Sequence, residues 1–193
     1  MLKLSERPLI FLDTETTGLN PENHEIIELA MIRVEPSGER YTYHWYIKPE
    51  HIETADEIAL RVNKYHERIE LWEKEGVTFA SIAPILQDVV RDGVFAGHNV
   101  GFDLDFLNAT FKKNNINAKL PYHKVDTVTL AYAHLAPLGL EKLSLDTIRD
   151  FFGWSREGNH TAMQDVRDTM KLYNTLTKGR IWCYWAWFKR LWR

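Results

Sequence analysis

The sequence predicts an α/β fold in which helices cover a central mixed sheet. Two observations carry this prediction: three strand-like segments joined by short turns come first, and strands that alternate with amphipathic helices follow. This order is typical of one layered domain that combines an antiparallel meander with parallel strands. The chain has 193 residues, of which 45% are hydrophobic and 26% charged, so it can bury a substantial core.

The antiparallel part is expected near the N-terminus. An apolar run, residues 9–12, ends at Asp13, and an aliphatic segment, residues 26–34, follows a polar turn. Residues 40–48 then alternate, with Tyr, Trp and Ile side chains on one face and more polar ones on the other. We therefore expect three neighbouring antiparallel strands, the first of which leads into Asp13.

Helical periodicity and capping residues define the rest of the chain. Thr54 is the expected N-cap of the first helix, and Pro84 lies in the first turn of the second. Ser144 and Gly153 are expected to begin and end a later helix. Two short strands are expected at residues 93–97 and 121–125. The expected helices cover residues 55–62, 81–91, 102–113, 127–135, 145–152 and 161–177.

The chain divides into one domain, residues 1–177, and a basic, tryptophan-rich tail, residues 178–193. Four of the 7 tryptophans fall in the tail, with five basic residues and no acid. Four uses of the tail stay open: packing on its own domain, docking on a protein partner, lying on an anionic membrane surface, and stacking on single-stranded nucleic acid.

The charge of the domain excludes one mode of nucleic-acid binding. The whole chain has a formal charge of −3, but residues 1–177 hold 19 basic and 27 acidic side chains, a formal charge of −8. A domain this acidic does not hold nucleic acid by bulk electrostatics. Binding of a polyanion therefore requires metal ions and a local groove.

The expected location is the cytoplasm. We find no signal peptide, because the first apolar run ends at Asp13. No segment approaches the roughly 20 apolar residues of a membrane span. Cys183 is the single cysteine, which excludes an internal disulfide and fits a reducing compartment.

Two carboxylates at the end of the first strand are the central candidates for function. Asp13 and Glu15 are two residues apart, so in a strand both side chains point to the same face. Carboxylates this close repel each other, and one takes up a proton unless a cation neutralises both. Oxygen-only ligation favours Mg2+ or Mn2+. The alternative is an ordinary polar turn after a strand.

Three further polar residues can join these carboxylates in the predicted fold. Asp103 begins a helix after a buried strand, and α/β sheets gather ligand sites at the carboxyl ends of strands. Asp165 lies in the first part of the last helix, and His160 lies five residues earlier, where it would act from the preceding loop. The alternatives are a helix N-terminal acid for Asp103 and an exposed loop residue for His160.

Three motifs together resemble those of a known enzyme family. Asp13-Thr14-Glu15-Thr16-Thr17-Gly18, His98-Asn99-x-x-Phe102-Asp103 and His160-x-Ala162-x-x-Asp165 resemble, in order and spacing, the motifs of the DEDDh 3'→5' exonucleases. These enzymes are relatives of the DNA polymerase III proofreading subunit (epsilon, DnaQ-like) in the ribonuclease H-like superfamily. The resemblance covers residues 8–177 and leaves the tail outside.

The resemblance implies a fold, an activity and a set of catalytic roles. The fold would be a five-stranded mixed sheet flanked by helices, and the activity would be metal-dependent removal of nucleotides from 3' ends. Asp13, Glu15 and Asp165 would be the main metal ligands. Asp103 would be the ligand of a second metal, and His160 would be the general base. The cofactors would be two Mg2+ or Mn2+ ions.

The resemblance also implies a pocket for the terminal nucleotide. Thr16, Gly18 and Leu19 match the segment whose backbone and apolar side chain hold that nucleotide. Ala59-Leu60-x-Val62-Asn63 resembles a helix that lines the same pocket, which makes Asn63 a candidate. Asn99 and Phe102 of the second motif complete the substrate-binding set. Asp126, in contrast, would be structural.

The expected function is a 3'→5' exonuclease that releases nucleoside 5'-monophosphates from single-stranded DNA ends, in proofreading or repair. The alternative within the enzyme class is an exoribonuclease that trims RNA or short oligonucleotides, since the sequence locates no contact to a 2'-hydroxyl. A catalytically silent binding or scaffolding module is a third interpretation. Four clustered carboxylates argue against it, because they destabilise a fold that binds no metal.

Overall fold

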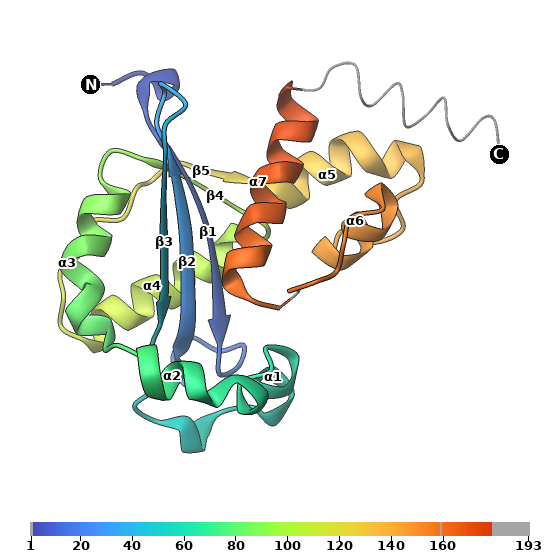
Figure 1. The fold of residues 1–193 in the computed structure, drawn as a ribbon. Coiled ribbons are helices and arrows are strands. Elements are labelled where there is room, and N and C mark those ends of the chain that lie inside the picture. The colour runs from blue at the N-terminus through green and yellow to red at the C-terminus, as the bar shows by residue number, and fades with distance from the viewer. Residues whose placement is uncertain (1, 159, 179–193) are drawn as a thin grey trace.

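The fold is a five-stranded mixed sheet with helices on both faces (Figure 1). A computed structural model describes residues 2–158 and 160–178. The strands are β1 (Leu9–Thr16), β2 (Ile26–Val34), β3 (Arg40–Tyr46), β4 (Val94–Gly97) and β5 (Lys124–Asp126). Their order is β3-β2-β1-β4-β5, with antiparallel pairing among the first three and parallel pairing of β1 with β4 and of β4 with β5. The predicted five-stranded mixed sheet is confirmed.

Helices cover the two faces of the sheet. The α-helices of the described residues are α1 (Glu57–Val62), α2 (Ile69–Glu75), α3 (Phe79–Val90), α4 (Val100–Lys113), α5 (Thr127–Leu135), α6 (Leu145–Phe152) and α7 (Ala162–Lys178). Short 3-10 turns occupy Leu4–Glu6, Ile52–Thr54, His66–Arg68 and Ala136–Leu138. Helices α3 and α4 lie on one face of the sheet, and α7 lies on the other with α5 and α6 beside it (Figure 1).

The alternation of side chains along β1 separates the core into two halves. Ile10 and Leu12 pack with α3 and α4, whereas Phe11 packs with α7. Side chains two residues apart in a strand share a face, so Asp13 and Glu15 lie on the α7 side. The end of β1 therefore presents its acidic side chains to the helix that follows the predicted catalytic loop.

The predicted N-cap of α1 is wrong. Asp56 caps this helix, since its side chain accepts a hydrogen bond from Ile58 N. Thr54 instead ends a 3-10 turn and donates its hydroxyl to His51 O at 2.8 Å. A tertiary contact decides between the two capping residues, because Asp56 N donates to Thr17 O at 2.7 Å and so ties the helix start to the end of β1.

The predicted start of α3 is also wrong. The helix begins at Phe79, and the side chain of Thr78 caps it by accepting a hydrogen bond from Ser81 N. Pro84 therefore lies inside the helix and not in its first turn. Phe79 is buried in the core at 5% exposure, which explains why the helix begins two residues before its predicted start.

One helix was not predicted and one strand is displaced. The sequence of α2 is polar, and the helix is held by Trp72, which is 2% exposed and donates its Nε1–H to Ile27 O at 2.6 Å. Strand β5 starts at Lys124 rather than at Pro121, because it pairs only with the last three residues of β4. Both differences are set by contacts with distant parts of the chain.

Helices α5 and α6 match the predicted spans. Ser144 caps α6 by accepting a hydrogen bond from Thr147 N, and Gly153 ends it with a φ of 67°. Glycine adopts this left-handed conformation without the strain that a Cβ atom would cause. The predicted caps of this helix are therefore confirmed.

The predicted tail, residues 178–193, lies outside the described residues apart from Lys178, where α7 ends. Its four proposed uses stay predictions, and so does the domain boundary at residue 177. Within residues 2–158 and 160–178, no helix combines the length and the apolar character needed to cross a membrane.

Helix α3 provides a test of the larger half of the core. Leu86 is fully buried, whereas its neighbour Ile85 is 49% exposed. Leu86→Ala should lower the free energy of unfolding by about 2–5 kcal/mol, because it removes buried methyl groups and leaves a cavity. Ile85→Ala is the matched control and should change it by only about 0.5 kcal/mol. Urea unfolding followed by circular dichroism measures both, and equal losses would contradict the packing.

Candidate active site

Three carboxylates meet where β1 ends and α7 begins. Asp13 and Glu15 come from one face of β1, and Asp165 comes from the first turn of α7, which packs against that strand. Each residue offers one carboxylate oxygen, and these three oxygens lie within 4.8 Å of one another. All three side chains are partly buried. The structure thus brings together three of the four predicted metal ligands.

These carboxylates oppose one another's ionisation. Burial raises the pKa of Asp13 well above its usual value, and the negative charges of Asp103 and Asp165 raise it further. Burial likewise raises the pKa of Glu15, and the charge of Asp165 adds to the shift. Burial also raises the pKa of Asp165, although Arg149 opposes this shift. The group therefore favours a nearby cation, and its oxygen donors suit Mg2+ or Mn2+.

Asp103 lies near the end of β1 that carries Asp13 and Glu15, but on the face of the sheet that α4 covers. It is 3% exposed, and its Oδ1 accepts hydrogen bonds of 2.8 Å from both the backbone N–H and the hydroxyl of Thr14. Burial raises the pKa of Asp103 to about 7, even though the bonds from Thr14 lower it. Its charge acts on Asp13, but it is not one of the three convergent residues.

His160 lies in the loop that leads into α7. Its φ is 61°, a left-handed conformation that costs a residue other than glycine about 1–2 kcal/mol. Its Nε2 lies 3.7 Å from Oδ2 of Asp146 in α6, and its side chain is 38% exposed. The hydroxyl of Thr161 then accepts a hydrogen bond from Gln164 N at 3.3 Å, so the helix starts directly after this residue. His160 is close enough to Asp165 for its charge to act on that carboxylate.

Arg149 is a site residue that the sequence did not reveal. It comes from α6, its side chain is 1% exposed, and its Nη2 donates to Oδ1 of Asp165 at 2.6 Å. It also binds Asp168 at 2.9 Å and Asp146 at 2.8 Å. The only sequence signal is the placement of Asp165 and Asp168 on one side of the last helix, which does not identify their partner.

A second, partly buried ion pair lies behind Glu15 and was not predicted either. Glu28 of β2 is directly opposite Glu15 in the sheet register and is fully buried. Its two oxygens bind His44 Nε2 at 2.8 Å and Arg68 Nη2 at 3.1 Å. The guanidinium of Arg68 lies 5.3 Å from the centroid of the Trp72 ring and lowers the pKa of Glu15. A positive charge thus partly offsets the acidic cluster from this side.

The predicted nucleotide-binding segment follows β1 directly. The hydroxyl of Thr16 donates to Gly18 O at 2.7 Å, and Nδ2 of Asn63 donates to Thr16 O at 3.1 Å. A Cβ atom at Gly18 would lie 2.5 Å from Nε2 of His24, so a larger residue would displace this ring, whose Nδ1 accepts a hydrogen bond from Asn20 N. Leu19 is 78% exposed next to this fixed turn. The turn is therefore held by hydrogen bonds and carries an apolar side chain into solvent.

The other two predicted substrate contacts lie at the start of α4. Asn99 is exposed, has a φ of 66°, and donates its backbone N–H to Oδ1 of Asp126 at 3.1 Å. The same oxygen accepts a hydrogen bond from Val128 N, so Asp126 caps α5 as a structural residue. Phe102 is partly buried, and its ring centroid lies 4.8 Å from that of Phe106.

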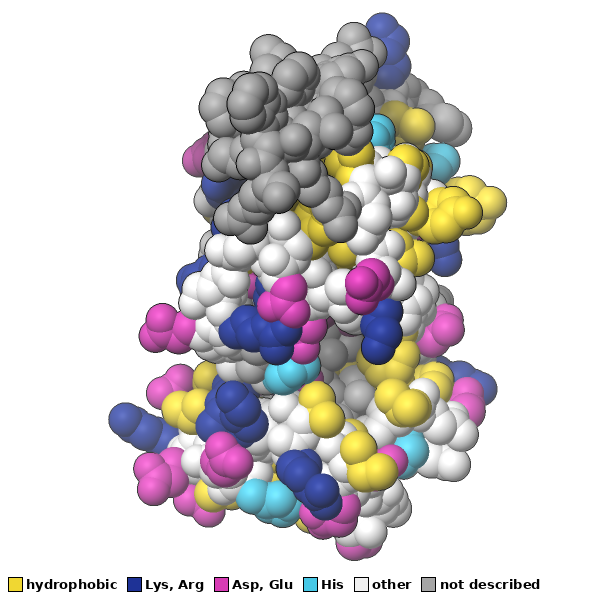
Figure 2. Space-filling view, turned by 90° about the vertical axis from the view of Figure 1, so that its right-hand side faces the viewer, with side chains coloured by type: hydrophobic (Ala, Val, Ile, Leu, Met, Phe, Trp, Pro, Cys, Tyr) yellow, Lys and Arg dark blue, Asp and Glu magenta, His cyan; other side chains and the backbone are white. Residues whose placement is uncertain are grey.

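The face that carries α5, α6 and α1 is hollowed at mid-height, and acidic, basic and histidine side chains surround the hollow (Figure 2).

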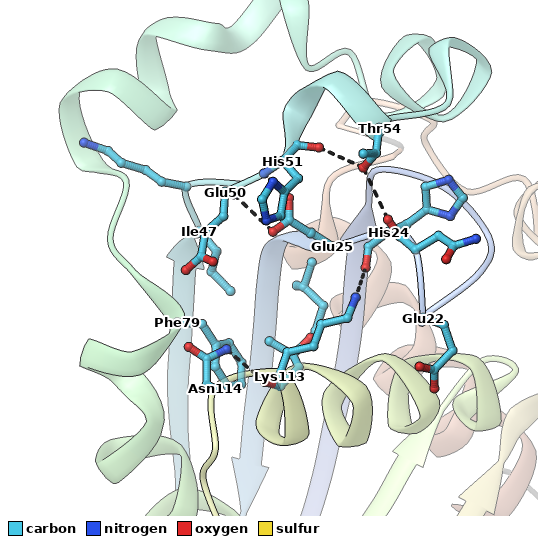
Figure 3. A pocket seen from close by; sticks show the side chains of 14 residues that line it. Glu22, His24, Glu25, Ile47, Glu50, His51, Thr54, Phe79, Lys113 and Asn114 are labelled. Atoms are coloured by element: carbon cyan, nitrogen blue, oxygen red, sulfur yellow. Dashed lines mark hydrogen bonds between the residues drawn. The ribbon is translucent and has the colours of Figure 1, made fainter.

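A different pocket, of about 340 Å³, lies at the C-terminal end of α4 (Figure 3). There Nζ of Lys113 donates to Pro21 O at 2.9 Å and to His24 O at 3.1 Å, which ties α4 to the loop after Leu19. None of the predicted site residues lines this second pocket.

Most of this chain matches a protein family and individual proteins of similar sequence. The Exonuclease family (RNase_T) matches residues 10–173. DNA polymerase III subunit epsilon of Pasteurella multocida is 33% identical over 181 residues, which cover 89% of this chain and 68% of that protein. The PolC-type DNA polymerase III of Thermotoga maritima is 28% identical over 165 residues, which cover 85% of this chain. The chain spans only about 11% of the length of such PolC-type relatives.

Solved structures share the fold and confirm the predicted ribonuclease H-like class. A structure of exonuclease I has a TM-score of 0.73 and 22% identity, and the match covers 95% of this chain and 43% of that one. E. coli exonuclease I in complex with a dT13 oligonucleotide has a TM-score of 0.71 and 21% identity, over 92% of this chain and 43% of that one. With the family match over residues 10–173 and the identity to the epsilon subunit, this chain belongs to the Exonuclease family.

Proposed function

We propose that the protein is a metal-dependent 3'→5' exonuclease that releases nucleoside 5'-monophosphates from single-stranded DNA ends, in proofreading or repair. The observation that carries this proposal is the convergence of carboxylate oxygens from Asp13, Glu15 and Asp165 within 4.8 Å, with His160 nearby. DNA as the substrate is supported by the relatives named as DNA polymerase III epsilon and by the fold shared with an exonuclease I bound to dT13.

The donor set fits two divalent cations, Mg2+ or Mn2+. Asp13, Glu15 and Asp165 would hold one ion, and Asp103 would contribute to the second. Four carboxylates supply the four negative charges that two such ions require, and the raised pKa values of Asp13 and Glu15 reflect that need. When bound, the ions would activate water and stabilise charge on the attacking and leaving oxygens.

The protein's own groups would bind the substrate end and move the proton. His160 would accept a proton from the attacking water, because histidine is the side chain best suited to proton exchange near neutral pH. Asp146, 3.7 Å from its Nε2, faces the ring from α6. The exposed Leu19 would contact the terminal base, and the turn from Thr16 to Gly18 would hold the backbone.

Location and partners rest on the sequence alone. We place the activity in the cytoplasm, in keeping with the single Cys183. The tail, residues 178–193, is the candidate for contact with a protein partner or a membrane surface, and its basic, aromatic composition supports either use.

Digestion of 5'-labelled single-stranded DNA and RNA of the same sequence tests the activity and its substrate. With Mg2+, a ladder should shorten from the 3' end, and EDTA should stop it. Asp13→Asn should slow digestion by about 100-fold or more, because it removes a ligand of ions that supply several kcal/mol of transition-state stabilisation. The control Asp88→Asn neutralises a carboxylate that is 70% exposed on α3 and should retain full activity.

The same digestion separates the competing functions. Faster shortening of RNA than of DNA would identify an exoribonuclease. Binding of either strand without any shortening by the wild-type chain would identify a silent binding module. Full activity of Asp13→Asn would refute the proposed site.

The role of His160 is tested by separating turnover from metal binding. His160→Ala should lower kcat by about 10²- to 10⁴-fold, since it removes the general base, and should leave Mn2+ affinity close to that of the wild type. His134→Ala replaces an exposed histidine on α5 and serves as the control. Mn2+ affinity is measured from the electron paramagnetic resonance signal of free Mn2+. A loss of affinity as large as the loss of kcat would make His160 a metal ligand instead.

The acidic cluster should also make the metal-free fold sensitive to pH. The folded state binds protons more tightly than the unfolded state, because burial raises the pKa of Asp13 and brings that of Asp103 to about 7 from 3.8. The stability that these two carboxyl groups contribute is therefore fully present below about pH 4, and it falls as pH rises through their pKa values in the folded state. Asp13→Asn should raise the metal-free Tm relative to the wild type at pH 8 and by less at pH 5.

Thermal unfolding in EDTA at both pH values measures this effect. Asp88→Asn, which neutralises an exposed carboxylate, should show no such pH-dependent gain. A gain for Asp13→Asn that is equal at pH 5 and pH 8 would mean that Asp13 does not hold its proton more tightly in the folded state.

A further inference from the structure

The buried guanidinium of Arg149 contacts three carboxylates on two helices. Asp146 lies one turn earlier on α6, and Asp165 and Asp168 lie on α7. The Arg149 side chain is 1% exposed, and the side chains of Asp168, Asp165 and Asp146 are 7%, 15% and 34% exposed. A charge buried to this degree is tolerated only when it is paired and its hydrogen bonds are satisfied. The three aspartates pair with the charge of Arg149, and each accepts a hydrogen bond from a different nitrogen of its guanidinium.

The geometry of these contacts fixes the direction of the guanidinium. Nη1 donates to Oδ1 of Asp146 at 2.8 Å and Nε donates to Oδ2 of Asp168 at 2.9 Å. The guanidinium is planar and rigid, so two anchored nitrogens determine where the third one lies. Nη2 is then directed at Oδ1 of Asp165, at 2.6 Å. Gln164 adds a hydrogen bond of 3.1 Å to the same oxygen of Asp168 and stabilises that anchor.

We propose that Arg149 is a positioning residue of the active site, which holds Oδ1 of Asp165 so that its other oxygen, Oδ2, is presented to a divalent cation. This inference rests on the proposed metal-dependent function. Arg149 does not contact the substrate in this assignment. It acts through Asp165, the one convergent carboxylate that comes from a helix and not from β1.

Asp146 places the Arg149 cluster beside the proposed general base. Asp146 binds Arg149 through Oδ1, and its Oδ2 lies 3.7 Å from Nε2 of His160. Asp165 and His160 belong to adjoining segments, the start of α7 and the loop before it. Arg149 therefore joins α6 to α7 directly, and its partner Asp146 lies next to the ring of His160.

Two other roles for Arg149 predict different results. If it only joined α6 to α7, its loss would lower stability and leave the cation affinity of the folded protein unchanged. If its positive charge mainly repelled the cation, its loss would strengthen cation binding. Arg149 and its three aspartates together carry a formal charge of −2, so the surroundings attract a cation even with Arg149 present. Partners that orient a ligand typically change affinity or activity by about 10- to 100-fold when they are removed.

Mn2+ titration of the full chain, read from the resonance of free Mn2+, tests the proposal without using activity. Arg149→Met keeps most of the side-chain volume and removes the charge and the donors. It should weaken Mn2+ binding by about 10- to 100-fold at a temperature where circular dichroism shows the protein to be folded. Arg149→Lys keeps one charged donor and should fall between Arg149→Met and the wild type.

Arg156→Met is the matched control. Arg156 pairs with Asp150 of α6 at the surface, with side chains 54% and 57% exposed, and the pair does not contact the carboxylate cluster. This variant should bind Mn2+ as the wild type does. In the digestion of labelled oligonucleotide, Arg149→Met should lower kcat and leave KM nearly unchanged, because the loss concerns the reacting centre and not substrate affinity.

Unchanged or tighter Mn2+ binding by folded Arg149→Met would overturn the positioning role. If Arg149→Met does not fold, Arg149→Lys decides the matter, and wild-type Mn2+ affinity in that variant would overturn the role. A wild-type chain whose Mn2+ binding is absent, or is unaffected by Asp13→Asn, would instead refute the proposed metal site itself. The two failures are therefore distinguishable.

Discussion

The concentration of negative charge at the end of β1 is the constraint on which the rest of the site depends. Alternation along the strand places Asp13 and Glu15 on the α7 side, and α7 adds Asp165, so that three carboxylate oxygens lie within 4.8 Å. Burial and mutual repulsion raise the pKa of Asp13 and of Glu15 well above the usual value. A fold that keeps these groups in place needs compensating positive charge, and the proposed cations would provide most of it.

The protein supplies part of that compensation with two arginines, the buried Arg149 and the partly buried Arg68. Arg149 binds Asp165 from α6, and Arg68 binds Glu28 behind Glu15. Each arginine is also held by groups outside the cluster, which are Asp146 and Asp168 for Arg149 and Tyr46 for Arg68. The charged groups therefore form a continuous arrangement that runs from β2, across the end of β1, to the interface of α6 and α7.

The sequence was sufficient for the features that local pattern determines, and insufficient for those that distant contacts determine. Two apolar runs and one alternating segment predicted β1 to β3, and the resemblance of three motifs to those of the DEDDh exonucleases predicted the meeting of Asp13, Glu15 and Asp165. Arg149 was missed because its partners on α7 are 16 and 19 residues away, at no recognisable spacing. The true cap of α1 was missed because Thr54 and Asp56 are both common N-cap residues, and the hydrogen bond from Asp56 N to Thr17 O that favours Asp56 joins distant parts of the chain. Helix α2 was missed because one tryptophan, Trp72, replaces the usual apolar stripe.

Helix α4 binds distant parts of the chain at both of its ends. Asp103, near its start, binds Thr14 of β1, and Lys113, its last residue, holds the carbonyls of Pro21 and His24 in the loop after Leu19. One inserted or deleted residue between them would rotate one contact by about 100° relative to the other. The segment from Asp103 to Lys113 is thus a spacer of fixed length. Substitution of its exposed side chains would leave both contacts in place, but an insertion or deletion there would separate Asp103 from the loop that Lys113 holds.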